Sequence, residues 1–430
     1  MICGKVLRAS AAQSATRDES ANLEKQIVER NLRYLAIEMF WAAIFTGCIS
    51  FNAAFMIRLG GSNLLISLLT AGAALINALA TMPFAALLER TARRKPLIIG
   101  SLAILRLSHL ALIAIPWLSG WHAETMLLIL LLLNVPVALF TAGWLPLLAE
   151  IIPLQRRARV FSSRSITLGI TVTICTFLFG SWLDQAPFPF NYQLLYALAV
   201  VTSSLSTVYV ARITMPESVV AAPMQRQPLS RKLLRELIST HRPFANIIFN
   251  TLIFNIALWM AVPLQPIYFV RTLGASDAWL GLWLGLVSGG TILGNLFWTR
   301  QIDRRGAAWA LVRATVLSSI YYFLIGAFPN LTLILLFALL AGLINPGVEL
   351  SHLTILFEVC PAERRATYMG AYITAMNIGA FIAPLAVAPL TALIGTQELV
   401  LTLGVLRLLG AALFVINPVR VARQPVTNVA

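Results

Sequence analysis

Charged residues are scarce in this chain of 430 residues: 11% are Asp, Glu, Lys or Arg, whereas 59% are hydrophobic. A soluble globular protein carries about 25% charged residues. So few charges cannot cover a water-exposed surface, which excludes a soluble globular fold and makes lipid the solvent for most of the chain. The apolar stretches, such as residues 126–136, are continuous rather than alternating. This pattern favours spanning helices over the alternating strands of a membrane barrel.

Cysteine and histidine are also scarce, at four residues each. Cys3, Cys48, Cys175 and Cys360 show no Cys-x-x-Cys spacing, so we interpret them as small apolar residues. The dispersed histidines predict no structural metal site, and we expect no cofactor. The sequence lacks a Gly-x-x-x-x-Gly-Lys-Ser/Thr motif, which argues against an ATP-driven pump. Ion gradients or facilitated diffusion remain as the driving force for any transport.

Twelve apolar stretches, numbered here as spans 1 to 12, are long enough to cross a bilayer, which takes about 20 residues. They lie near 33–57, 63–88, 96–118, 124–152, 160–183, 191–213, 243–270, 277–299, 307–328, 331–358, 367–394 and 397–417. The polar segment 1–32 is expected to be a cytoplasmic tail rather than a cleaved signal peptide. We therefore predict an all-α integral membrane protein. Its parts are two six-helix bundles (33–213 and 243–418), a cytoplasmic linker (214–242) and a C-terminal tail (419–430).

Positive charge is concentrated in alternate loops. Arg and Lys occupy the N-terminal tail and every second loop, whereas the opposite loops offer only Arg58 and Arg271. By the positive-inside rule, both termini and the 214–242 linker are cytoplasmic. This asymmetry explains the net charge of +15, and its dispersal over short loops argues against a nucleic-acid partner. We expect a monomer that lies in the lipid bilayer of a bacterial inner membrane or a plasma membrane.

An internal repeat relates the two halves of the chain. The loop after span 4 reads Glu-Ile-Ile-Pro-Leu-Gln-Arg-Arg-Ala over residues 150–158, and the loop after span 10 reads Glu-Val-Cys-Pro-Ala-Glu-Arg-Arg-Ala over 358–366. An acid-Arg pair likewise follows span 2, at 89–90, and span 8, at 303–304. Two matched loops in two matched places indicate a duplicated six-helix unit.

These loops resemble signatures of the major facilitator superfamily. Its pattern between helices 2 and 3 is Gly-x-x-x-Asp-Arg-x-Gly-Arg-Lys; residues 85–95 here read Ala-Ala-Leu-Leu-Glu-Arg-Thr-Ala-Arg-Arg-Lys, and 303–306 keep Asp-Arg-Arg-Gly. Met-Pro-Glu-Ser at 215–218 is similar to a common family tail. The Gly-x-x-x-Gly-Pro-type motif of drug antiporters is missing from span 5, where Gly169 and Gly180 are eleven residues apart without a Pro. The resemblance implies two bundles around a midplane cavity lined by helices 1, 4, 7 and 10, with alternating access by rocking.

The repeated loops also predict a cytoplasmic gate. A carboxylate beside an arginine-rich loop can form charge pairs that hold one state closed, and it is favourable at a helix N-terminus. The alternative is that these charges only anchor the cytoplasmic helix ends. The gate candidates are Glu89, Arg90, Asp303, Arg304, Glu150, Arg157, Glu358 and Arg365.

Span 10 carries a candidate site for a substrate or a proton. Asn345, Glu349 and His352 stand at i, i+4 and i+7, on one face of a helix, and a Pro-Gly pair before Glu349 is expected to loosen that helix. An ionisable group within a span costs about 2.5–3.5 kcal/mol, so it needs a partner or a watery cavity. Glu349 is therefore predicted to bind substrate, carry a proton, or pair with Arg313 or Arg407.

Other polar residues of the spans complete the candidate set. Glu38 and Asn52 share a face of span 1, but Glu38 lies barely a turn inside the boundary, where its carboxylate could instead reach the interface. In span 7, Trp259 could stack on a sugar or aromatic solute, with packing as the alternative. The remaining candidates are Asn255 and Gln265 in span 7 and Asn134 and Thr141 in span 4.

These observations predict a secondary transporter that moves a small solute by alternating access, with or without a coupled proton. Import and export, and metabolites and drugs, stay open. Two other classes also remain, a non-transporting membrane sensor and an integral-membrane enzyme on the same scaffold. An enzyme would need His, Asp or Glu clustered at one interface, and the sequence offers no such cluster, so we expect no catalysis.

Overall fold

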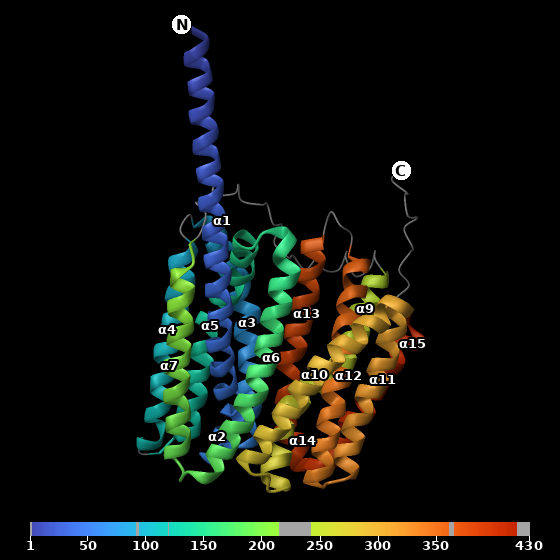
Figure 1. The fold of residues 1–430 in the computed structure, drawn as a ribbon. Helices are drawn as coiled ribbons and strands as arrows, with labels where there is room; N and C mark the ends of the chain where they lie inside the picture. The colour runs from blue at the N-terminus through green and yellow to red at the C-terminus, as the bar shows by residue number, and fades with distance from the viewer. Residues whose placement is uncertain (1, 92–93, 119, 215–241, 361–364, 419–430) are drawn as a thin grey trace.

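The computed structural model describes the chain except for residues 1, 92–93, 119, 215–241, 361–364 and 419–430 (Figure 1). Within the described residues, twelve helices are long and apolar enough to cross a membrane, and no strand occurs. The prediction of an all-α integral membrane protein is therefore confirmed. Most of the predicted linker 214–242 and tail 419–430 lies outside the described residues.

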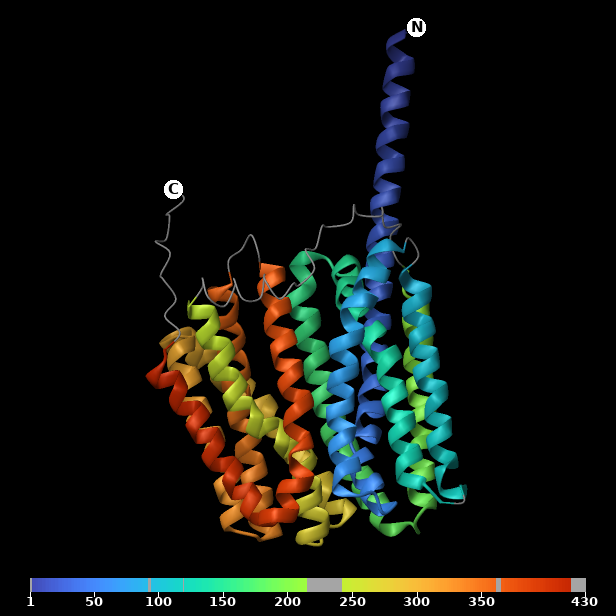
Figure 2. The ribbon, with the colours of Figure 1, turned by 180° about the vertical axis from the view of Figure 1, so that it is seen from behind.

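The first bundle contains spans 1 to 6. Its helices are α1 (Ile2–Ile49), α2 (Asn52–Arg58), α3 (Asn63–Arg90), α4 (Arg94–Ala114), α5 (His122–Ile151), α6 (Leu154–Gln185) and α7 (Phe190–Arg212), with a 3-10 turn at Ile115–Trp117. Span 1 is broken, because α1 ends at Ile49 and α2 restarts at Asn52. The N-terminal segment continues α1 beyond the bundle (Figures 1 and 2).

The second bundle contains spans 7 to 12. Its helices are α9 (Arg242–Ile267), α10 (Asp277–Arg305), α11 (Ala307–Ala327), α12 (Leu331–Val359), α13 (Arg365–Leu385), α14 (Val387–Ile394) and α15 (Thr396–Ile416), with a π turn at Tyr268–Thr272 after α9. α13 and α14 together form span 11. The described parts of both chain ends lie at the same end of the molecule, called here the termini end (Figure 1).

The two bundles meet along two pairs of helices, α6 beside α10 and α3 beside α13 (Figures 1 and 2). Glycine allows the close approach of α6 and α10: a Cβ atom on Gly281 would lie 2.2 Å from the carbonyl oxygen of Thr176, and one on Gly180 would lie 2.5 Å from that of Asp277. Small residues let membrane helices pack backbone to backbone, where lipid provides no hydrophobic driving force. The glycines therefore fix how closely the bundles meet.

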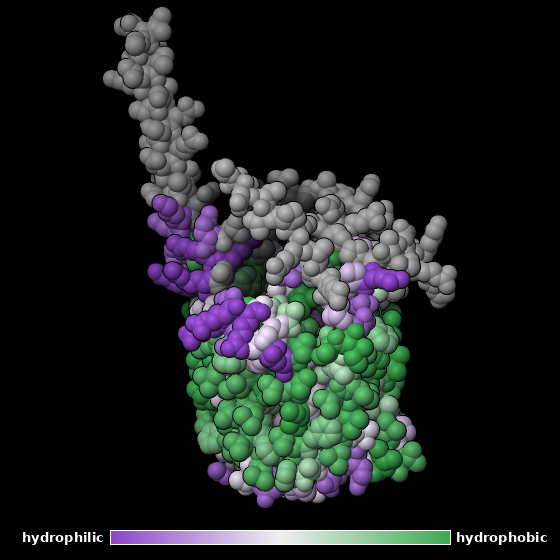
Figure 3. Space-filling view, turned by 90° about the vertical axis from the view of Figure 1, so that its right-hand side faces the viewer, coloured by the Kyte–Doolittle hydropathy of each residue, from purple (hydrophilic) through white to green (hydrophobic). Residues whose placement is uncertain are grey.

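The outer surface has the distribution of polarity that a bilayer requires. On the face that Figure 3 shows, a broad apolar belt covers the helices and is bounded by hydrophilic residues at both ends of the molecule. Trp117 and Trp121 lie exposed between α4 and α5, near one edge of this belt. Aromatic residues are typical of the membrane–water interface, so the belt marks the membrane-embedded part of the protein.

Candidate functional site

A cavity of about 340 Å³ lies between the two bundles. Its walls come from spans 1, 7 and 8, namely Ser50, Phe51, Ala53, Ala54, Val262, Gln265, Pro266, Phe269, Leu280, Trp283 and Leu284. The lining is apolar and aromatic with two polar side chains, Ser50 and Gln265. The Ser50 hydroxyl donates to the Thr46 carbonyl of its own helix at 2.8 Å. Gln265, predicted from the sequence, is thus the side chain best placed to bind a solute in this cavity.

Both inner helices are irregular beside this cavity. Span 1 breaks between Ile49 and Asn52, and span 7 contains Pro263 and Pro266 before its π turn. Proline removes a backbone donor, and π turns widen a helix and are frequent at functional sites. Irregular backbone within a membrane is tolerated where it borders a cavity. The sequence therefore places the backbone breaks of both halves at the same cavity.

A reciprocal set of contacts closes the interface at the end away from the termini. Arg58, at the end of span 1, forms an ion pair with Asp277, at the start of span 8, with 3.4 Å between guanidinium nitrogen and carboxylate oxygen. Arg271, at the end of span 7, donates to the side chain of Asn63, at the start of span 2. Each bundle thus contributes one arginine and one acceptor. We call these four residues the latch.

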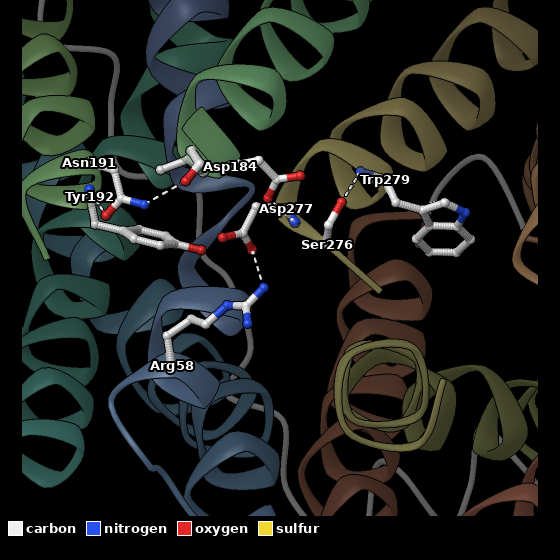
Figure 4. A network of polar contacts seen from close by, with 8 residues as sticks. Arg58, Asp184, Asn191, Tyr192, Ser276, Asp277 and Trp279 are labelled. Atoms are coloured by element: carbon white, nitrogen blue, oxygen red, sulfur yellow. Dashed lines mark hydrogen bonds and ion pairs between the residues drawn. The ribbon is translucent and has the colours of Figure 1, made fainter. Parts of the chain in front are cut away.

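The Asp277 half of the latch is surrounded by residues of the first bundle (Figure 4). Asp277 is only 3% exposed, and its backbone N–H donates to the carboxylate of Asp184 at 2.8 Å. The hydroxyl of Tyr192 points toward the Asp277 carboxylate. A carboxylate buried this far requires a compensating charge, and Arg58 supplies it.

The other half of the latch pairs an arginine with neutral acceptors. Arg271 also donates to the Gly61 carbonyl, and Asn63 in turn donates to the hydroxyl of Thr391 at 3.3 Å. Thr391 belongs to α14, so spans 2, 7 and 11 meet at this point. The contacts satisfy the arginine with a carbonyl and an amide rather than with a carboxylate.

A repeat that the sequence interpretation missed underlies the latch. Residues 59–63 read Leu-Gly-Gly-Ser-Asn and residues 273–277 read Leu-Gly-Ala-Ser-Asp, each just after a latch arginine. In both copies the glycine has a positive φ, 83° at Gly60 and 68° at Gly274, and the serine caps the following helix. Arg58 and Arg271 entered the sequence interpretation only as exceptions to the charge asymmetry, whereas this repeat was the signal that could have identified them.

The span 10 candidates lie on α12 but face different surroundings. Asn345 and Glu349 are exposed, whereas His352 is half-buried. The His352 Nε2 atom lies 2.8 Å from the hydroxyl of Thr251 on α9 and 3.5 Å from that of Tyr372 on α13. The histidine therefore joins three helices of the second bundle, and the Glu349 side chain one turn before it is exposed.

The predicted pairing of Glu349 with Arg313 or Arg407 is wrong. The Arg313 guanidinium carbon lies 4.1 Å from the centre of the Trp309 ring, and that of Arg407 lies 4.2 Å from the Phe254 ring. Among the described residues, Glu349 forms no ion pair. Both arginines have aromatic neighbours on other faces of the bundle, and sequence spacing alone does not contain that information.

Glu38 is buried rather than interfacial, so the expectation that its carboxylate reaches the membrane surface is wrong. The side chain is 4% exposed. Its carboxylate accepts hydrogen bonds from Arg164 of α6 at 2.8 Å and from Ser206 of α7 at 3.2 Å. These contacts tie spans 1, 5 and 6 together within the first bundle.

Most other span candidates have partners inside their own bundle. Asn52 accepts a hydrogen bond from the Tyr196 hydroxyl at 2.8 Å, and Asn134 donates to the Leu130 carbonyl at 2.8 Å. The Trp259 ring rests against α13, where a Cβ atom on a glycine would lie 2.3 Å from it. The two remaining span candidates differ in burial, since Asn255 is half-buried and Thr141 is exposed.

The predicted cytoplasmic gate is described only in part. The side chains of Glu89, Glu150 and Arg365 lie outside the described structure. The Arg157 Nε atom donates to the Ile152 carbonyl at 3.1 Å. The exposed gate candidates are Arg90, Asp303, Arg304 and Glu358. Among the side chains that the structure describes, no ion pair joins the bundles at the termini end, so the gate stays a prediction.

Comparison with known proteins places this architecture in a family. The family model described as the Major Facilitator Superfamily matches residues 33–276 and 247–429. A comparison with proteins of curated function finds no match to the sequence.

Solved structures of transporters share the fold at low sequence identity. A mutant of the nucleoside transporter NupG aligns with a TM-score of 0.73 at 11% identity, over 90% of this chain and 99% of that one. A bacterial homologue of the human lysosomal transporter Spinster aligns with a TM-score of 0.65 at 14% identity, over 91% and 96%. A POT family transporter in complex with 5-aminolevulinic acid aligns with a TM-score of 0.68 at 12% identity, over 90% and 95%. The chain, with its two six-helix bundles, therefore belongs to the major facilitator superfamily.

Proposed function

We propose that this protein is a secondary transporter that moves a small solute across the membrane by alternating access. The observation that carries the proposal is the cavity between the bundles together with the latch on one side of it. A cavity at the interface of two repeated bundles is where transporters of this architecture expose a solute to one face of the membrane and then the other. The latch holds the side away from the termini closed.

The cavity favours an uncharged solute with an apolar or aromatic part. No charged side chain is among the residues that line it, and Phe51, Phe269 and Trp283 offer flat apolar surfaces. The Gln265 amide can both donate and accept a hydrogen bond. A cavity of about 340 Å³ is at the lower end of the range for small-molecule sites, about 300–1,000 Å³. We infer that a compact solute is recognised by stacking and by one amide contact.

The exposed face of α12 is the candidate for proton coupling. Glu349 lies one turn from His352, which reaches α9 and α13, and both of those helices contact the first bundle. Glu349 does not line the cavity of about 340 Å³, and its exposed carboxylate is accessible to a proton wherever water reaches this face of α12. We propose that Glu349 carries the proton if transport is proton-coupled.

The charge distribution favours one orientation of the protein in the membrane. We propose that both termini are cytoplasmic, that the protein lies in a plasma or bacterial inner membrane, and that it is a monomer. We further propose that it leaves its solute chemically unchanged, because its family and the structures it resembles are transporters.

The proposed function is tested by ligand screening and reconstitution. A solute that binds only the folded protein raises its melting temperature by mass action. We expect an uncharged solute from a metabolite and drug panel to stabilise the wild type but not Gln265→Leu, and to enter proteoliposomes that contain the wild type. Asn295→Leu, which removes an exposed amide outside the cavity, is the matched control. Binding without uptake of any solute would favour the membrane sensor instead.

A further inference from the structure

A second cavity, separate from the one between the bundles, opens between α10 and α11. Its volume is about 520 Å³, and the residues that line it are Phe297, Trp298, Trp309, Val312, Arg313, Val316 and Leu317. α11 lies at the outer edge of the second bundle (Figure 1), and Phe297 and Leu317 on the rim are exposed. Because this surface belongs to the apolar belt, the cavity is a groove open to lipid.

Two arginines stand at the end of this groove nearer the termini. The guanidinium carbons of Arg305 and Arg313 lie 4.4 and 4.1 Å from the centre of the Trp309 ring. Both side chains are exposed, and within the described part of the chain neither forms an ion pair. The groove therefore has an indole and two cations at one end and apolar side chains along the rest.

Arg313 is the residue that needs explanation. It lies six residues after the start of α11, about 9 Å along the helix axis. A charged side chain on the lipid face at this depth is unfavourable by about 2.5–3.5 kcal/mol unless it reaches the interface or acquires a counter-charge. The Arg313 Nη1 atom donates to the Trp309 carbonyl at 3.4 Å, so the guanidinium lies over the turn of α11 that is nearer the membrane surface, where lipid phosphates lie.

We propose that the groove binds one anionic glycerophospholipid from the leaflet at the termini end. Guanidinium groups bind phosphate oxygens in bidentate geometry, and two of them can hold a phosphate together with a further negative headgroup charge. The apolar wall from Val312 to Leu317 fits an acyl chain that runs toward the membrane centre. A free phosphate would leave that wall uncovered, and a soluble peptide would have to enter the bilayer, so the amphipathic shape favours a lipid.

The proposal is tested by lipid retention of the purified full-length protein, measured by native mass spectrometry. The probes are phosphatidylglycerol, phosphatidylcholine with the same acyl chains, and inorganic phosphate. The variants are Arg305→Gln/Arg313→Gln, which removes both cations, and Leu317→Trp, which fills the exposed apolar end of the groove. Arg212→Gln is the matched control, because Arg212 is exposed and also lies over an aromatic ring, that of Tyr209 at 5.6 Å, but lines no described groove.

We expect the wild type and Arg212→Gln to retain phosphatidylglycerol about tenfold more strongly than phosphatidylcholine. The double variant should lose this preference, and Leu317→Trp should weaken retention while both arginines remain. Equal retention of the two lipids, or a preference that survives in the double variant, would overturn the proposal. Displacement of the lipid by inorganic phosphate would show a free-anion site instead, and a peptide retained in place of lipid would show a protein partner.

Discussion

Single residues of the latch decide how firmly one side of the transporter is closed. Arg58 is 37% exposed in its side chain, whereas Asp277 is almost wholly buried. Loss of Arg58 leaves a buried carboxylate without its counter-charge. This loss costs more free energy than the loss of an exposed ion pair does. The closed arrangement is the one that buries Asp277, so this cost falls on that state alone.

Arg58→Gln should therefore populate the state that is open on the side away from the termini. A charge-assisted hydrogen bond contributes about 1.5–3 kcal/mol, so this population should rise by about tenfold or more. The measurement is labelling of a cysteine at position 50, in a background without the native cysteines, by a membrane-impermeant reagent added from that side. Arg212→Gln should label like the parent, and unchanged labelling of Arg58→Gln would contradict the role of the latch.

Glu349 is expected to act in coupling rather than in stability. Because it is exposed and forms no described ion pair, Glu349→Gln should express and melt like the wild type. If transport is proton-coupled, the variant should lose accumulation driven by a pH gradient but keep counterflow exchange, since exchange requires no net proton movement. Glu124→Gln, which removes an exposed carboxylate in the first turn of α5, serves as control. Normal gradient-driven uptake by Glu349→Gln would remove this residue from the coupling pathway.

Two arginine–glutamate pairs in the first bundle differ mainly in burial. Arg164 pairs with buried Glu38, whereas Arg156 pairs with Glu29, and both partners of that second pair are about half exposed. Arg164→Met should destabilise the protein by about 3–5 kcal/mol, because it leaves a buried carboxylate unpaired. Arg156→Met should cost about 0–1 kcal/mol. Thermal unfolding of both variants in one detergent makes the comparison, and equal losses would argue against a buried Glu38.

At the scale of helices, the contact between α6 and α10 determines how closely the bundles approach. Gly281→Val should prevent this close approach, because a valine side chain there would overlap the α6 backbone. We expect slower transport with preserved solute binding, as measured by counterflow and thermal shift. Gly289→Ala provides the control on the same helix, because a Cβ atom at Gly289 meets nothing within 4 Å. Transport at the wild-type rate in Gly281→Val would show that this close contact is dispensable.

The elements themselves could be predicted from the sequence. Spans near 307–328 and 397–417 correspond to helices at Ala307–Ala327 and Thr396–Ile416, because a continuous apolar run in lipid has one stable backbone structure. The candidate site was harder to predict from the sequence than the helices were. Gln265 was among the predicted candidates, but Phe51 and Trp283 were not. Apolar residues that line a cavity come from separate spans, and in a sequence they cannot be distinguished from the other apolar residues of a membrane helix. The Glu38–Arg164 pair joins residues 126 positions apart, and only the folded bundle brings them together.

At the scale of the whole molecule, the described parts of both chain ends lie at one end and the latch at the other. The excess of Arg and Lys at the termini end predicts that this end faces the cytoplasm. A cysteine introduced at position 226, in the linker between the bundles, should react with a membrane-impermeant reagent only after the cells are opened. Labelling in intact cells would reverse the proposed orientation.

The asymmetry of the latch bears on how the two halves of the chain would pair if they were separate molecules. Two copies of the first half would bring Arg58 against Asn63, and two copies of the second half would bring Arg271 against Asp277. Only the mixed pair seen here buries one carboxylate against an arginine of the other half while an amide and a carbonyl satisfy the second arginine. Taken together, however, the two self-pairings would contain the same two Arg–Asp and two Arg–Asn contacts as two mixed assemblies. If the linker were cut and the halves were made as separate chains, the choice of partner would therefore rest on the contact between α6 and α10, where Gly180 and Gly281 let the backbones meet.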